Sequence, residues 1–287
     1  MKTIQMTKTT INRDGFQGRY FASQQRDIAL LVLGGSEGSV AFTNSVAKSF
    51  SAIGISALAV YYFRTIQTGC SLSNIPVETI EHAVNWLKNS GTKKIIVYGL
   101  SKGAELALLA ASLIAEINGV IAVSGSCCIF EGLTWNLKSS GKSSWQWRDN
   151  EVPYVSTSGA VPSFFSTLIK NGEMNYFDSF NRLLEVEMTE NTVIHVENIK
   201  GPILLLSAKE DVVWPSKRMN ELIINRLEEK KFKYNYSHKT FSPASHFLTP
   251  THQLIYSIFR LERNNKPLCR LARQQAFDCT LDFLADF

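Results

Sequence analysis

The chain has 287 residues, of which 45% are hydrophobic and 19% charged, and its formal net charge is +5. This composition indicates a globular protein long enough to bury a sizeable core. The Lys and Arg residues are dispersed, so no nucleic-acid footprint is indicated, and no apolar run is long enough to span a membrane.

The cysteines and the N-terminus bear on the cellular compartment. The first residues, MKTIQMTKTT, lack the apolar core of a signal peptide, and the five cysteines have no regular spacing. We therefore expect a cytoplasmic protein in which the adjacent Cys127 and Cys128 are free thiols. No cluster of Cys, His and carboxylate residues has zinc spacing, so we predict no metal.

Apolar runs alternate with amphipathic segments along most of the chain. Between Thr3 and Phe21, two short segments around Asn12-Arg13-Asp14-Gly15 predict a hairpin. The buried strands predicted after it are Asp27–Leu33, Ile55–Phe63, Lys94–Tyr98, Gly119–Ser124, Pro202–Ala208 and Phe232–Tyr236. The helices predicted between and after them end at Gly54, start at Pro76, and cover Ala104–Ser112, Ser216–Leu227 and Leu271–Phe287.

This order of elements predicts an α/β fold with a mostly parallel central sheet covered by helices on both faces. Ligands of such sheets bind at the carboxyl ends of the strands. The loop that begins at Gly34-Gly35 and the turn at Ser101 both follow strands, so we expect them to face one crevice.

Residues 126–201 interrupt the alternation, and we expect them to form a cap-like insertion over the crevice within a single domain of residues 1–287. The segment is rich in Ser and in aromatic residues. Its aromatic side chains either line an acyl-binding pocket or build a small core of the insertion's own. The candidate substrate contacts are Trp135, Trp145, Trp147 and, in a later loop, Trp214.

Residues 99–103 read Gly-Leu-Ser-Lys-Gly, a G-x-S-x-G motif between a predicted strand and a predicted helix. In such a sharp turn the central serine takes a strained backbone conformation, and the flanking glycines avoid collisions with neighbouring backbone. The turn places the Ser101 hydroxyl at the N-terminus of a helix, whose dipole favours developing negative charge. The motif is typical of the nucleophile of an α/β-hydrolase.

A serine nucleophile needs a histidine base and a carboxylate that orients it, and in α/β-hydrolases these follow in the order Ser, acid, His. The loop after Pro202–Ala208 offers Asp211, with Glu210 as competitor. The loop after the segment KFKYNYSHKTF offers His246, with His238 as competitor within or at the end of that strand. We predict Asp211 and His246, and we expect the remaining histidines to be surface or cap residues, namely His82, His195 and His252.

The oxyanion hole is predicted to combine two backbone N–H groups. One belongs to Lys102, the residue after the nucleophile, and the other to Gly35 or Ser36 in the loop after the first parallel strand. A phosphate-binding role for this glycine-rich loop is disfavoured, because it lacks the Lys-Ser/Thr ending of a P-loop and departs from G-x-G-x-x-G.

Several segments resemble the C-terminal catalytic domain of acyl-CoA thioesterases and bile acid-CoA:amino acid N-acyltransferase. They are GLSKGAELALLAAS, IPVETIEHAVNWLK, LGGSEGS, KEDVVWPS and SPASHFLTP, and the resemblance covers most of Asp27 to Pro250. It implies an α/β-hydrolase related to dienelactone hydrolase. The family's triad then falls on Ser101, Asp211 and His246, in agreement with the residues chosen above.

The chain departs from this family at three points. The mammalian members carry an N-terminal β-sandwich domain, for which we expect no room here. The transferase has a cysteine nucleophile where this chain has Ser101, and the glycine that usually precedes the catalytic histidine is Ser245.

The resemblance and the motif together predict a serine hydrolase that cleaves an acyl-CoA-like thioester through an acyl-enzyme. The alternatives are a carboxylesterase and an acyltransferase to an amine or alcohol. We expect no metal or organic cofactor, since coenzyme A would be part of the substrate. The oligomeric state is not predicted.

Overall fold

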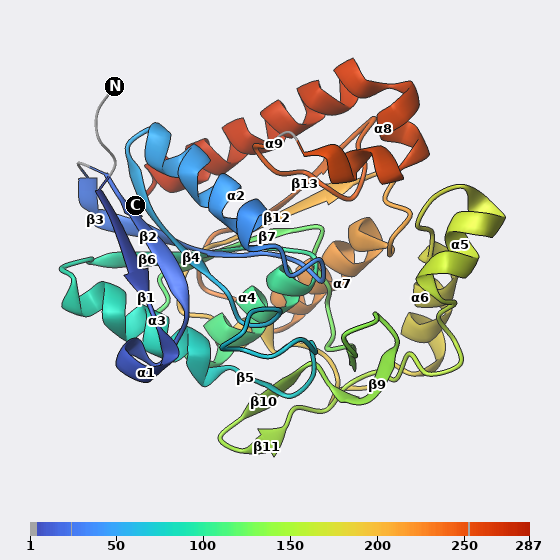
Figure 1. The fold of residues 1–287 in the computed structure, drawn as a ribbon, viewed down its shortest axis with the longest axis horizontal. Helices are drawn as coiled ribbons and strands as arrows, with labels where there is room; N and C mark the ends of the chain where they lie inside the picture. The colour runs from blue at the N-terminus through green and yellow to red at the C-terminus, as the bar shows by residue number, and fades with distance from the viewer. Residues whose placement is uncertain (1–4, 24, 252) are drawn as a thin grey trace.

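The computed structural model describes residues 5–23, 25–251 and 253–287. Across these residues the main sheet has eight strands, and six of them are parallel neighbours (Figure 1). In spatial order the strands are β1 (Gln5–Thr9), β2 (Gly18–Ala22), β4 (Ile55–Val60), β3 (Gln25–Leu33), β6 (Lys94–Leu100), β7 (Gly119–Val123), β12 (Ile203–Ala208) and β13 (Tyr236–Phe241). The antiparallel pair β1 and β2 joins the sheet beside β4.

Helices cover both faces of this sheet. The helices α2 (Val40–Ala52) and α9 (Lys266–Ala285) pack on one face, and α3 (Glu78–Asn89), α4 (Lys102–Leu113) and α7 (Ser216–Glu229) pack on the other (Figure 1). The predicted α/β-hydrolase architecture is therefore confirmed.

The apolar runs of the strands follow from this two-sided cover. In β3, Leu30 and Val32 pack in the cluster that contains α2 and α9, whereas Leu31 and Leu33 pack in the cluster that contains α3 and α4. Successive side chains of a strand point to opposite faces, so a strand buried on both faces needs apolar residues at every position.

The segment 126–201 extends from the carboxyl side of the sheet. It contains β8 (Glu131–Leu133), β9 (Ser139–Ser143), β10 (Trp145–Trp147), β11 (Asn150–Glu151), α5 (Phe164–Asn171), α6 (Phe177–Val186) and the 3-10 turn η1 (Val196–Asn198). Strand β10 pairs with β5 (Ile75–Pro76), which precedes α3. Phe130, Trp145 and Leu184 belong to the same buried cluster as α4, so these side chains of the segment share the main core.

Several element bounds differ from the sequence prediction. The last strand, β13, covers Tyr236–Phe241 and shares only Tyr236 with the predicted Phe232–Tyr236. Its partner β12 begins at Ile203, which pairs with Tyr236, and the Phe232 N–H bonds back to Leu227 in α7. Helix α3 begins at Glu78, since Pro76 pairs in β5. A helical turn, α1 (Ile11–Asp14), separates the two strands of the predicted hairpin.

The C-terminal region also differs. Helix α9 begins at Lys266, before the predicted Leu271, and it follows two elements that were not predicted, η2 (Leu254–Ile258) and α8 (Arg260–Asn264). His252 and Thr3 lie outside the described residues. Cys127 and Cys128 are free thiols as expected. None of the helices in the described part of the chain has the length and hydrophobicity needed to cross a membrane.

Candidate active site

The turn between β6 and α4 holds Ser101 in a strained conformation. Ser101 has φ 56° and ψ −121° and lies at the N-cap of α4. A Cβ atom on Gly99 would lie 2.1 Å from the carbonyl oxygen of Gly103, and one on Gly103 would lie 2.2 Å from that of Gly34. Both contacts are impossible, so only glycine fits at the two flanking positions of the motif.

Asp211 and His246 form a buried pair. His246 Nδ1 lies 2.9 Å from Asp211 Oδ2, and both side chains are almost completely buried. The Asp211 carboxylate also accepts from the Ser216 hydroxyl at Oδ2, at 2.6 Å. Its Oδ1 accepts from the backbone N–H groups of Val213 at 2.9 Å and Trp214 at 3.4 Å. A carboxylate beside Nδ1 favours the tautomer that carries its proton there, which leaves Nε2 free to accept one.

The competing acid and base have other partners. Glu210 accepts hydrogen bonds from the Ser242 hydroxyl at 2.6 Å and from the Ala244 N–H at 3.0 Å, so it supports the loop that carries His246. His238, on β13, is bonded through Nε2 to the Ser207 hydroxyl at 2.7 Å, and burial lowers its pKa. Neither lines the cavity described next.

Two further histidines, His82 and His195, contact residues away from the Ser101 turn. His82 Nδ1 lies 3.1 Å from the carbonyl oxygen of Gly15, and His195 lies beside Arg226 and Glu197. Neither is among the described residues that line the cavity.

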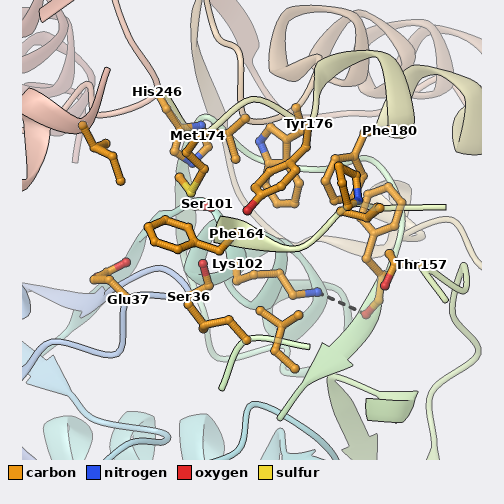
Figure 2. A pocket seen from close by; sticks show the side chains of 18 of the residues that line it. Ser36, Glu37, Ser101, Lys102, Thr157, Phe164, Met174, Tyr176, Phe180 and His246 are labelled. Carbon is orange, nitrogen blue, oxygen red and sulfur yellow. Dashed lines mark hydrogen bonds between the residues drawn. The ribbon is translucent and has the colours of Figure 1, made fainter. Parts of the chain in front are cut away.

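Ser101 and His246 line one cavity of about 310 Å³ at the carboxyl ends of the strands (Figure 2). Among the described residues, no hydrogen bond is present at the Ser101 hydroxyl.

Most of the cavity lining is apolar and comes from the segment 126–201, the loop after β12 and the region around η2. The apolar residues are Phe130, Leu133, Leu137, Val161, Pro162, Phe164, Met174, Tyr176, Phe180, Val213, Trp214, Phe247, Ile255 and Ile258.

The loop after β3 lies beside Ser101. An added Cβ on Gly35 would lie 3.1 Å from the Ser101 Cβ. The Gly35 N–H donates to Glu37 Oε1 at 3.0 Å, and the Tyr62 hydroxyl donates to the Gly34 carbonyl at 2.5 Å. These two contacts hold the loop in place.

The predicted oxyanion donors therefore differ in availability. The Gly35 N–H is bonded to the Glu37 carboxylate. Within the described residues, the backbone N–H groups of Ser36 and Lys102 have no acceptor. Burial raises the pKa of Glu37, while the Gly35 N–H and the nearby His246 oppose that rise.

A buried ion pair adjoins Ser101. Lys102 Nζ lies 2.6 Å from Glu105 Oε1 and donates to the Phe130 carbonyl at 3.1 Å (the dashed line in Figure 2). The Trp145 indole N–H donates to the same Glu105 oxygen at 2.8 Å. Burial lowers the pKa of Lys102 and raises that of Glu105, and the attraction between the two charges opposes both shifts.

One protein family matches more than half of the chain. The family "BAAT / Acyl-CoA thioester hydrolase C terminal" matches residues 75–259, a range that includes Ser101, Asp211 and His246. The chain belongs to this family. Its members are α/β-hydrolases of the esterase and thioesterase kind, so the protein is a hydrolase-type enzyme. No curated protein matches the chain.

Solved structures agree on the fold. A protein assigned as a dienelactone hydrolase from Klebsiella pneumoniae subsp. pneumoniae MGH 78578 is 12% identical with a TM-score of 0.57, and each chain is covered in full. A dienelactone hydrolase-like promiscuous phosphotriesterase from metagenomic libraries is 11% identical with a TM-score of 0.56, over 99% of this chain and 98% of that one.

The Pyrococcus horikoshii acylaminoacyl peptidase is 13% identical with a TM-score of 0.55, over 99% of this chain and 42% of that one. At such identities these likenesses show the fold alone.

Of the four tryptophans predicted to contact substrate, only Trp214 lines the cavity. Trp145 is instead fully buried in the core of this hydrolase, where its indole N–H donates to Glu105. Trp147 packs against the Arg148 guanidinium, 4.2 Å from its ring centre, and Trp135 is 67% exposed.

The sequence prediction did not single out several residues around the site. Phe130, Met174 and Arg64 line the cavity and stand in none of the quoted motifs. Glu37 also lines it and lies in the segment LGGSEGS, but no role was predicted for it. The spacing of Lys102 and Glu105, three residues apart on one helix, is a sequence signal that could have indicated the ion pair beside Ser101.

Proposed function

We propose that this member of the family is a serine hydrolase that cleaves an acyl thioester through Ser101, His246 and Asp211. The observation that carries the proposal is the buried 2.9 Å contact of His246 with Asp211, in a chain whose Ser101 and His246 line the same cavity. Ser101 alone, or His246 alone, would not indicate catalysis. A strained serine and a carboxylate-bound histidine that line one cavity meet the needs of nucleophilic catalysis.

In the proposed reaction the Ser101 oxygen attacks the acyl carbonyl, and His246 Nε2 takes the proton of the Ser101 hydroxyl. The tetrahedral oxyanion is held by the N–H groups of Ser36 and Lys102, which have no acceptor among the described residues. As the bond to the leaving group breaks, His246 returns the proton to it. A water molecule then attacks the acyl-enzyme, His246 takes the water's proton, and the proton returns to Ser101 as the acid leaves.

Two contacts support Ser36 over Gly35 as the loop donor. The Gly35 N–H is engaged by the Glu37 carboxylate, and that bond closes a tight turn that leaves the next N–H, of Ser36, available. We propose Glu37 as a positioning residue of this turn. The Tyr62 hydroxyl donates to the Gly34 carbonyl and also holds this turn in place.

The cavity supports an acyl group as the bound portion of the substrate. Its lining is mostly aromatic and aliphatic, as a hydrocarbon chain requires. The exposed Arg64 also lines the cavity, and a cation there suits the phosphates of a coenzyme A leaving group.

We further propose that the chain is one domain with residues 126–201 as its insertion, because side chains of that segment share the main core.

The test compares an acyl-CoA with a neutral ester of the same acyl chain, for the wild type and for Ser101→Ala. Ser101→Ala should lower kcat by about 10⁴-fold or more on both substrates and abolish labelling by a fluorophosphonate. Added salt should lower kcat/KM for the acyl-CoA and leave that for the ester unchanged. Identical salt responses, with much faster turnover of the ester, would replace the thioesterase by a carboxylesterase. Undiminished activity of Ser101→Ala would refute the nucleophile.

A further inference from the structure

Large apolar side chains are exposed around the mouth of the catalytic cavity. Among the described residues, the four most exposed large hydrophobic side chains are Ile66, Leu254, Ile169 and Phe165, and the last three are 95%, 87% and 74% exposed. Each belongs to a segment that also contributes to the cavity lining, through Arg64, Ile255 or Phe164.

Helix α5 shows the pattern most clearly. Phe165 and Ile169 are four residues apart, so they lie on the same face of the helix, and both are exposed, whereas Thr167 on the other side is buried. Phe164, next to Phe165, lines the cavity instead. The helix lies at the outer edge of the molecule, beside α6 (Figure 1). Its apolar outer face therefore continues the apolar lining to the protein surface.

The charges of the same segments have one sign. Residues 64–70, 134–142, 163–171 and 254–260, which we call the rim, contain no Asp or Glu in the sequence. Their basic residues are all exposed, and none of them forms an ion pair with a described residue. These residues are Arg64, Lys138, Lys142, Lys170 and Arg260.

We propose that the rim docks on an anionic lipid surface and presents the cavity mouth to amphiphilic substrate held there. Exposed Phe, Ile, Leu and Trp side chains interleaved with unpaired cations are what an interfacial protein surface requires, since apolar groups enter the acyl boundary while Lys and Arg face anionic headgroups. A protein partner of equal apolar area would not require rim segments without a single acid. The proposal extends the proposed function, because it assumes that the cavity receives an acyl chain.

The direct test is co-sedimentation of the full chain with unilamellar vesicles. The wild type should bind vesicles of equal parts phosphatidylglycerol and phosphatidylcholine, should bind phosphatidylcholine vesicles far more weakly, and should dissociate as salt is added. Phe165→Ser/Ile169→Ser should weaken binding to the anionic vesicles by roughly tenfold or more. Lys138→Gln/Lys170→Gln should weaken it by about tenfold.

Matched controls separate the rim from exposed apolar surface in general. Ile53→Ser/Leu113→Ser alters two exposed apolar side chains at the C-terminal ends of α2 and α4, away from the carboxyl edge of the sheet, and should leave vesicle binding unchanged. Phe165→Ser/Ile169→Ser should retain the wild-type rate on a water-soluble short-chain ester, because neither residue lines the cavity.

Vesicle binding is independent of turnover. Ser101→Ala should therefore bind like the wild type, and a failure of the proposed chemistry would leave this result intact. Equal binding by the wild type and Phe165→Ser/Ile169→Ser, or no binding to anionic vesicles, would overturn the proposal. So would a dimer, in sedimentation velocity, that dissociates in the same double variant while vesicles are not bound, because the rim would then be an interface between copies of the chain.

Discussion

Two regions meet at the cavity, and they are held in different ways. The first region, which we call the floor, consists of the Ser101 turn and the Asp211 loop, and backbone contacts hold it. Parallel strands place both at their carboxyl ends, and tightly packed glycines shape the turn at Ser101. The insertion combines backbone pairing, as between β10 and β5, with a buried charged side chain: the carboxylate of Glu131 accepts hydrogen bonds from five of its residues. These are Ser139, Gly141, Ser156, Thr157 and Ser158.

This contrast determines where single substitutions should act. A floor fixed by backbone geometry keeps its shape when a reactive side chain is changed, so changes there should alter chemistry without unfolding the protein. An insertion held in part by buried charges should lose stability when one of those charges is removed. Four substitutions with their controls test this contrast.

Asp211→Asn should lower kcat by about 10⁴-fold with little change in the free energy of unfolding, because an amide can stabilise the wrong tautomer of His246 and cannot offset its developing charge. Steady-state kinetics and urea unfolding check the two parts. Glu210→Gln is the matched control in the adjacent position and should change kcat far less, since Glu210 contacts the loop backbone and not His246. Equal losses in the two variants would show that the acid is misassigned.

Sequence reasoning located the floor because its determinants are local. Apolar runs predict strands buried on both faces, and Gly99 and Gly103 predict a turn that excludes a Cβ. The same reasoning chose Asp211 over Glu210 and His246 over His238 from position in loops, and in the structure Asp211 and His246 are the pair in contact.

The insertion could not be predicted in this way, because its contacts are tertiary. Trp145 and Trp214 look alike in sequence, yet Trp145 is bonded to Glu105 in the core and Trp214 lines the cavity. Likewise, where β13 begins depends on its pairing with Ile203, which the composition of residues 232–236 does not reveal.

Lys102→Met should destabilise the protein by about 3–5 kcal/mol, since it leaves the Glu105 carboxylate buried without its cation. Lys102→Met/Glu105→Gln should recover most of that loss, because the glutamine oxygen still accepts from the Trp145 indole and carries no charge. Urea unfolding of the two variants checks this. If the double variant is as unstable as the single one, the ion pair is not the source of the effect.

Glu131→Gln should destabilise the protein by about 3 kcal/mol near neutral pH. The hydrogen bonds of the insertion lower the pKa of Glu131 to about 2, although burial alone would raise it. A carboxyl group with a lowered folded-state pKa adds stability above its unfolded pKa, near 4.5, and loses that contribution as pH falls toward 2.

The difference in unfolding free energy between wild type and Glu131→Gln should therefore be largest above about pH 5 and shrink as the solution is acidified. Urea titrations at several pH values measure it. The exposed Glu229 supplies the control, because Glu229→Gln should leave unfolding unchanged throughout. A difference that does not vary with pH would mean that the charge of Glu131 is not what holds the insertion.

The smallest effect concerns substrate selection and compares two neighbouring rings of α5. Phe164 lines the cavity while Phe165 is 74% exposed, so Phe164→Ala and Phe165→Ala remove the same atoms from opposite sides of one helix. If the insertion confines the acyl chain, Phe164→Ala should lower kcat/KM for long monomeric acyl substrates by about fourfold for each CH₂ group that loses its burial, about 0.8 kcal/mol, and should spare short ones. Phe165→Ala should not change the dependence on chain length, and a parallel change in both variants would assign the effect to the stability of α5 rather than to the cavity wall.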